Sequence, residues 1–157
     1  DKTPTALLLT RQGVPVLHLS EEEIEDGVKK GAYTVLENSN TPEIVLLASG
    51  SEVSLAAEIA EKLKDKKIRV VSMPCWELFE HQSDDYKNSI IPPRGCLKVS
   101  LEAGITTGWE KYVGPTGLMI GINHYGKSGP YKELANEFGF TAEQVVERIN
   151  KHIKKLI

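Results

Sequence analysis

The fold is decided by the stretch Ile44-Val-Leu-Leu-Ala-Ser-Gly-Ser-Glu-Val53, together with the helix-like sequence that follows it. Its mostly apolar residues Ile44–Ser49 predict a strand that is buried on both faces. Gly50 allows a tight turn, and Ser51 is placed to cap a helix whose apolar residues recur at helical spacing. Ile68–Met73 then predicts a second strand. Such a strand–helix–strand unit crosses over right-handed in a parallel sheet.

The remaining strands and helices extend this unit in both directions. Further strands are predicted at 5–10, 31–37, 96–101 and 117–122, and helices near 76–80, 81–89, 107–113, 131–138 and 141–153. We expect Tyr33–Glu37 to run antiparallel to Thr5–Thr10 as its hairpin partner. His18–Lys30 contains the capping-box residues Ser20 and Glu23, but its Gly27 and weak apolar periodicity favour a linker over a helix. The pattern predicts an α/β fold, a three-layer α/β/α sandwich with a five-stranded, mostly parallel sheet and one antiparallel strand.

Composition and charge exclude several classes of protein. The 157 residues are 40% hydrophobic and 26% charged, which is typical of one globular domain. The net charge of −3 gives no sign of a nucleic-acid or membrane-surface partner, and no apolar run has the length of a membrane helix. Cys75 and Cys96 form no CxxC pair, and two free thiols suit a reducing compartment. We therefore expect a cytoplasmic protein.

A P-loop pattern, GxxxxGK[ST], is matched by Gly121-Ile-Asn-His-Tyr-Gly-Lys-Ser128. A true P-loop starts its helix at the Gly-Lys-Ser, whereas Pro130 favours a helix that starts about three residues later. Such a protein also needs a later strand that ends in an Asp for the metal, and nothing after Ser128 is predicted to be a strand. Nucleotide binding is therefore a minor alternative for this loop.

The carboxyl ends of the parallel strands carry other candidates, because ligands bind at this edge of such sheets. Gly50-Ser51 is either a phosphate cradle or a simple capped turn, and the turn is favoured. Glu102 lies where a functional carboxylate would lie, but it is equally suited to holding a main-chain amide or a neighbouring subunit. Cys75 has no base beside it, and the four histidines lack the spacing of metal ligands. Arg11 directly follows a predicted strand and is suited to a bidentate grip on a phosphate, although a surface or interface role is more common. These residues form no complete catalytic constellation.

Several stretches, taken in order, resemble the C-terminal end of transketolase. They are Leu9-Thr-Arg-Gln-Gly-Val-Pro-Val-Leu17, Ala48-Ser-Gly-Ser-Glu-Val53, Val71-Ser-Met-Pro74, Leu101-Glu-Ala-Gly104, Gly108-Trp-Glu-Lys-Tyr-Val113, Tyr125-Gly-Lys-Ser-Gly-Pro-Tyr131 and Glu137-Phe-Gly-Phe-Thr141. Each piece is short, but the ordered set runs over nearly the whole chain. The Thr-Arg-Gln and Tyr-Gly-Lys-Ser-Gly-Pro pieces favour transketolase over deoxyxylulose-phosphate synthase or the pyruvate dehydrogenase β subunit, which share the fold.

This resemblance implies both a domain division and a function. Residues 1–20 would be the last strand and linker of a preceding, pyrimidine-binding domain, and residues 21–157 the transketolase C-terminal domain. The whole enzyme would transfer a two-carbon ketol unit from a ketose phosphate to an aldose phosphate. It would use thiamine diphosphate and a divalent metal, Mg²⁺ or Ca²⁺, and the cofactor would carry the chemistry.

The same resemblance places the cofactor and metal motifs in earlier domains. This chain alone is therefore expected to bind no cofactor or metal and to contribute no catalytic residue. Arg11 matches the arginine that binds the substrate phosphate, and the rest matches a domain used for packing and homodimer formation. Asp1 stands where an initiator Met is expected, which indicates a cut inside a longer chain, although maturation leaves the same kind of end. The alternative is a free-standing interaction or regulatory module that dimerises through the Trp109–Tyr112 helix.

Overall fold

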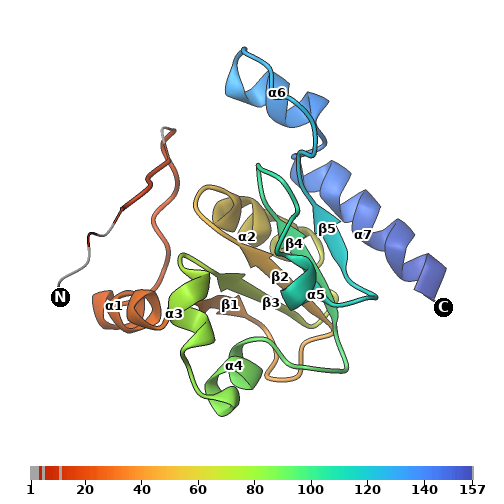
Figure 1. Ribbon diagram of the computed structural model, residues 1–157. Helices are drawn as coiled ribbons and strands as arrows, with labels where there is room; N and C mark the ends of the chain where they lie inside the picture. Colours follow the sequence, from red (N-terminus) through yellow and green to blue (C-terminus); the bar gives the residue numbers. More distant parts are fainter. Residues whose placement is uncertain (1–3, 5, 11, 157) are drawn as a thin grey trace.

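A central five-stranded sheet carries helices on both of its faces (Figure 1). The computed structural model describes residues 4, 6–10 and 12–156. The strands are β1 (Tyr33–Glu37), β2 (Ile44–Ala48), β3 (Ile68–Ser72), β4 (Leu97–Leu101) and β5 (Leu118–Ile120). The helices are α1 (Glu21–Lys30), α2 (Glu52–Lys62), α3 (Trp76–Glu80), α4 (Asp84–Ile90), α5 (Glu110–Val113), α6 (Tyr131–Glu137) and α7 (Ala142–Leu156). Within the described part of the chain, none of the helices has the length and apolarity needed to cross a membrane.

The strand order in the sheet is β1-β3-β2-β4-β5. β2 pairs in parallel with both β3 and β4, so that Leu46 lies opposite Val70 on one side and Val99 on the other. β4 and β5 are also parallel, while β1 runs antiparallel to β3. The predicted fold class, mostly parallel with one antiparallel strand, is confirmed.

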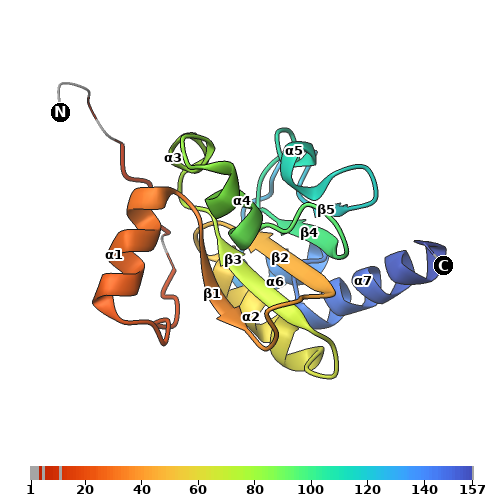
Figure 2. The same cartoon turned by 90° about the horizontal axis from the view of Figure 1, so that it is seen from below.

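Two apolar cores form because successive residues of β2 point to opposite faces of the sheet. Ile44, Leu46 and Ala48 face α2 and α7, whereas Val45 and Leu47 face α3, α4 and α5. All five of these residues are at most 1% exposed. Figure 2 shows the sheet between the two helical layers, with α1 beside β1 at one edge. The fold is therefore the predicted three-layer sandwich.

α1 corrects the prediction of a linker between His18 and Lys30. Ser20 Oγ accepts from the Glu23 backbone N–H at 3.2 Å, and Glu23 Oε2 accepts from the Ser20 N–H at 2.8 Å, which completes a capping box. The glycine that argued against a helix has a packing role: a Cβ at Gly27 would overlap the ring of Tyr33 on β1. The helix thus needs a glycine where it meets the sheet.

The N-terminal stretch differs most from expectation. The described residues of Thr5–Thr10 form no strand, and Leu7, Leu8 and Leu9 are 80%, 89% and 79% exposed. The predicted hairpin with this stretch is wrong, because β1 pairs with β3 instead. An apolar run indicates that a segment will be buried, but it does not identify the partner that buries it.

The predicted cap of α2 is wrong. Ser51 has helical backbone angles and does not cap α2; its Oγ donates to Glu52 Oε1 at 2.9 Å. A capping serine needs an extended backbone, which the turn at Gly50 does not give it. Ser83 does cap α4, and Thr141 Oγ1 accepts from the Gln144 N–H at 3.3 Å at the start of α7.

Candidate functional site

Two glutamates meet at the carboxyl ends of β2 and β4. Glu102 directly follows β4, and its Oε2 accepts a hydrogen bond of 2.9 Å from Ser49 Oγ, which directly follows β2. Glu52 is the first residue of α2 and is only 7% exposed. The parallel pairing of β2 with β4 brings these carboxyl groups together from distant parts of the sequence.

The surroundings of Glu52 shift its pKa. Burial raises the pKa of Glu52; the hydrogen bond from Ser51 acts in the opposite direction, and the charge of Glu102 raises the pKa further. The raised pKa thus reflects a buried acid that lies beside a second acid. A buried carboxyl group with a perturbed pKa is a feature of functional sites, although structural networks contain such groups as well.

An apolar cavity of about 160 Å³ adjoins Glu52. It lies between the loops after β4 and β5 and the helix α6, and its walls include Ile122, Leu134, Phe138 and Phe140. No residue of α6 within the described chain is fully buried, so this helix forms a loosely packed cover. The cavity and Glu52 together form an apolar pocket with one charged wall.

The P-loop pattern does not adopt the geometry of a P-loop. α6 begins at Tyr131, three positions after Ser128, as the position of Pro130 predicted. Lys127, which would bind phosphate, forms an ion pair with Glu137 at the end of α6. Asn123 Oδ1 accepts from the Thr106 N–H at 2.9 Å and ties the loop to the segment after β4. The loop is therefore a structural connection.

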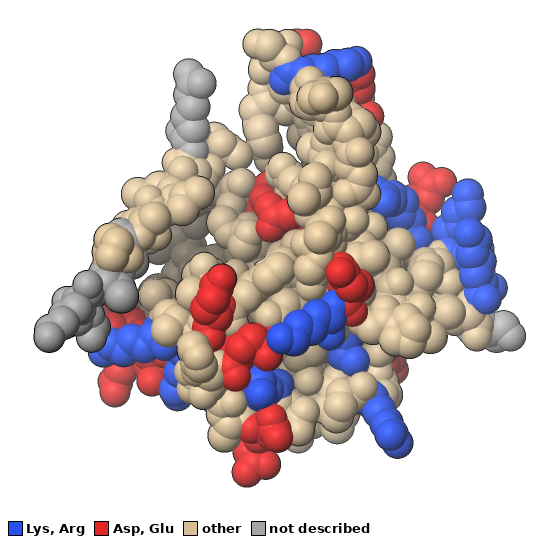
Figure 3. Space-filling view, in the orientation of Figure 1, with Lys and Arg blue, Asp and Glu red and all other residues tan. Residues whose placement is uncertain are grey.

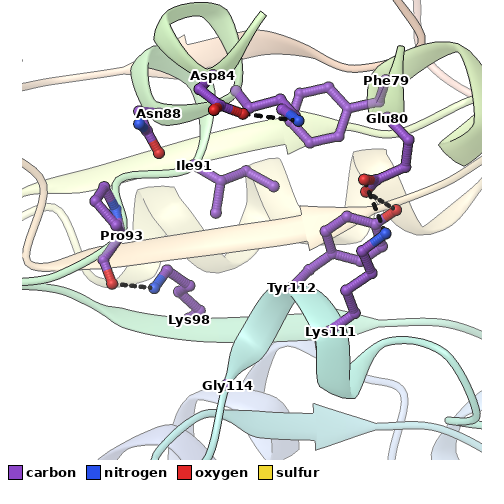
Figure 4. Close-up of a pocket in the computed structure, with 11 residues that line it drawn as sticks. Phe79, Glu80, Asp84, Asn88, Ile91, Pro93, Lys98, Lys111, Tyr112 and Gly114 are labelled. Carbon is purple, nitrogen blue, oxygen red and sulfur yellow. Dashed lines mark hydrogen bonds and ion pairs between the residues drawn. The ribbon is translucent and has the colours of Figure 1, made fainter. Parts of the chain in front are cut away.

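A larger cavity, of about 370 Å³, opens between α3, α4 and α5 (Figure 4). Its lysines already have partners: Lys87 pairs with Asp84 at 3.0 Å, and Lys111 pairs with Glu80 at 2.8 Å. Lys98 Nζ donates to the Pro93 carbonyl at 3.1 Å. With these cations engaged, the described residues that line the cavity offer no built anion site.

Trp109, which directly precedes α5, and Tyr112 on α5 lie in the second core. Trp109 is 1% exposed and Tyr112 is 8% exposed, and both rings pack against Trp76, with centroids 4.9 Å and 5.3 Å away. Tyr112 also donates to Glu80 Oε1 at 2.9 Å. Because these side chains are packed inside, they cannot form the dimer surface of a free-standing module.

The other predicted site residues are scattered or lie outside the described residues. Arg11 is one of the residues that the structure does not describe. The Cys75 Sγ lies 3.5 Å from a Glu77 carboxylate oxygen, which is no arrangement for a nucleophile with its base. Among the described residues there is no group of three or more His, Cys, Asp or Glu side chains that could hold a metal ion. The described residues of this chain therefore do not fit a metal site.

The face of the molecule in the view of Figure 1 carries charges of both signs. Figure 3 shows Lys and Arg side chains interspersed with Asp and Glu, mainly over the lower half of the face in view. Two exposed large apolar side chains lie in the loops at the carboxyl end of the sheet: Ile105 after β4 (64% exposed) and Tyr125 after β5 (98% exposed). Others lie elsewhere, such as Leu78 on α3 and Leu156 on α7.

Residues 31–141 match the family model described as the transketolase-like TK C-terminal domain. The chain belongs to this family. Over 151 residues it is 48% identical to transketolase from Staphylococcus aureus (strain MW2), an alignment that covers 95% of this chain and 23% of the relative. It is 45% identical over 148 residues to transketolase from Aquifex aeolicus (strain VF5), covering 93% of this chain and 22% of that relative. The chain thus spans less than a quarter of the length of these relatives.

Solved transketolases have the same fold. A transketolase from Pichia stipitis in complex with sedoheptulose-7-phosphate superposes with a TM-score of 0.81 at 36% identity, over 92% of this chain and 20% of that one. The transketolase from Leishmania mexicana gives a TM-score of 0.75 at 41% identity, over 83% of this chain and 19% of the other. The recognition of a transketolase C-terminal domain from its ordered motifs is confirmed.

Two of the motifs that resemble transketolase supply the residues of the glutamate pair. Ala48–Val53 carries Ser49 and Glu52, and Leu101–Gly104 carries Glu102. The sequence did not identify Glu52 as a candidate site residue. A glutamate at the first position of a helix is usually exposed, and its negative charge interacts favourably with the helix dipole. Its position in the sequence, between a buried strand and the buried Val53, could have indicated that Glu52 is buried as well.

Proposed function

We propose that the chain acts as the C-terminal domain of a transketolase. The whole enzyme would transfer a two-carbon ketol unit between sugar phosphates, using thiamine diphosphate and a divalent metal bound by its other domains. The observation that carries this proposal is 48% identity to a transketolase over 95% of the chain. The Pichia stipitis relative forms a complex with sedoheptulose-7-phosphate, which supports the substrate class. Residues 1–20 would belong to the preceding domain, with Arg11 binding the substrate phosphate.

The domain's role would be packing and homodimer formation, and the carboxyl end of the sheet is the surface we assign to packing. The large exposed apolar side chains of this region, such as Ile105 and Tyr125, would be buried by the remainder of the enzyme. Two free cysteines, Cys75 and Cys96, are compatible with the reducing cytoplasm, which we propose as the location.

A chimera tests this function. This chain would replace the matching 151 residues of the Staphylococcus aureus transketolase. The chimera should form dimers and keep at least about a tenth of the parent's activity, because exchanging a packing domain leaves the chemistry in place. A chimera that folds and dimerises but has lost all ketol transfer would contradict the proposal.

Two double variants of the chimera test whether the carboxyl end of the sheet is the packing surface. Ile105→Ser with Tyr125→Ser should weaken dimerisation or lower activity. Val28→Ser with Leu36→Ser changes apolar residues that are 45% and 41% exposed near the β1 edge, and it should have little effect. Equal effects of the two double variants would argue against the carboxyl end as the packing surface.

A further inference from the structure

The cavity under α6 has the size of a single aromatic ring. Its volume is about 160 Å³, and the side chains of Ile122, Leu134, Phe138 and Phe140 give it apolar walls. An apolar protein cavity of about 150 Å³ is large enough to bind benzene. One side of the cavity is formed by α6, whose residues are exposed except for the half-buried Leu134 and Ala135, so the cavity is open to solvent beside this helix. A flat six-membered ring therefore fits the space.

The charged wall of the cavity is unusual. Glu52 lines it and is 93% buried, since only 7% of its surface is exposed. The groups that stabilise its carboxylate are neutral: the Ser51 hydroxyl at 2.9 Å and the backbone amide of Ala103. The nearby charged group is Glu102, which carries the same sign. Glu52 is thus a buried acid without a counter-charge among these neighbours.

Lys127, in the loop before α6, pairs with Glu137. Arg148 lies beside Gly139, between Phe138 and Phe140, but it is not one of the residues that line the cavity. No Lys or Arg is among the described residues that line the cavity. A buried carboxylate is stable when a cation is placed beside it and hydrogen bonds complete its shell. A ligand that brings its own cation would supply what the protein lacks here.

We propose that this cavity binds a small molecule with one aromatic ring and one protonated amine, of the benzylamine class. The ring lies among the apolar side chains of β5's loop and α6, and the ammonium group contacts the Glu52 carboxylate. The proposal does not depend on the function proposed above.

Calorimetry and NMR at neutral pH test the site with benzylamine as the probe. Benzylamine should bind with a Kd of about 1 mM, as expected for so small a ligand. Benzyl alcohol has nearly the same shape without the charge, and it should bind at least about tenfold more weakly. The methyl signals of Ile122 and Leu134 should shift on binding, since these side chains line the cavity.

Three variants separate this site from non-specific binding. Glu52→Gln should remove the preference for the amine over the alcohol. Glu58→Gln, an exposed position on the same helix, should leave it unchanged. Ala135→Met should fill the cavity and abolish binding of both probes while the helix is kept. Thermal unfolding of each variant shows that it is folded.

Either of two results overturns the proposal. One is the absence of saturable shifts with benzylamine up to about 20 mM, well above the expected Kd. The other is equal binding of amine and alcohol by the unaltered protein, which would mean that Glu52 does not select a cation.

Discussion

Ser49 and Glu102 join the carboxyl ends of β2 and β4 through a hydrogen bond of 2.9 Å. The bond is partly buried and involves a carboxylate, so it is of the stronger kind. It also orients Glu102 beside Glu52 in this transketolase C-terminal domain.

Ser49→Ala should lower the free energy of unfolding by about 1–2 kcal/mol, because it leaves a carboxylate without its donor. Urea denaturation measures the change. Ser39→Ala is the matched control, because Ser39 Oγ makes only exposed contacts within a turn. A loss no greater than that of the control would show that water replaces the serine at no cost.

The raised pKa of Glu52 predicts how the free energy of unfolding changes with pH. Burial raises its pKa above the ordinary value of 4.5, so the folded protein keeps this proton to higher pH than the unfolded chain. The free energy of unfolding therefore falls as pH rises between the two pKa values. Glu52→Gln does not titrate, and its stability relative to the unaltered protein should rise from pH 4.5 upward and then level off. Urea denaturation across a pH series checks this; parallel profiles would contradict it, and Glu58→Gln serves as the control.

Arg69 is expected to matter far more than its ion-pair partner. It is 6% exposed, and its guanidinium donates to Glu37, at 2.8 Å, and to the carbonyls of Ser89 and Ile90. Arg69→Ala leaves the buried Ile90 carbonyl and the part-buried Ser89 carbonyl without this donor, and it should cost about 3 kcal/mol of stability. Glu37→Ala removes only a partly exposed carboxylate and should cost less than about 1 kcal/mol. Comparable losses in chemical denaturation would show that the ion pair dominates.

Two glycines with positive φ should respond differently to alanine. At Gly108, where φ is +95°, a Cβ would lie 2.5 Å from the Trp76 ring, whereas at Gly50, where φ is +53°, it would meet open space. Gly50→Ala carries only left-handed backbone strain, about 1 kcal/mol. Gly108→Ala adds a clash in the aromatic core, and its loss should exceed about 2 kcal/mol. Thermal unfolding distinguishes the two, and equal shifts in Tm would contradict the predicted clash.

Arg11 gives a prediction for the whole enzyme. In the Staphylococcus aureus chimera, Arg11→Ala should raise KM at least about tenfold for phosphorylated sugars, since a guanidinium–phosphate contact is lost. The KM for an unphosphorylated acceptor should change little. Steady-state kinetics with both substrates measure this, and equal effects would rule out a phosphate role for Arg11.

The sheet was predictable from sequence because its strands are buried on both faces. Ile44–Ala48 is apolar at every position, and a run of that kind identifies a central parallel strand without knowledge of its neighbours. The apolar Leu7–Leu9 carries the same local signal, yet it lies exposed. Local sequence indicates the need for burial and does not specify the partner.

The remaining differences come from tertiary contacts. Gly27 counted against a helix because its purpose, making room for Tyr33, depends on how α1 meets β1. The meeting of Glu52 and Glu102 depends on β4 lying beside β2, while β3, which is nearer in sequence, takes the opposite side. Sequence order alone does not settle that choice.

The antiparallel edge strand has a consequence for synthesis on the ribosome. β1 precedes β2 and α2 in the chain, but its hydrogen-bond partner is β3. A nascent chain must therefore expose β1 until Ser72 has emerged, whereas α1 can form earlier from its own capping box. We expect Gly31–Met73 to be the smallest segment that must leave the ribosome before β1 can pair with β3.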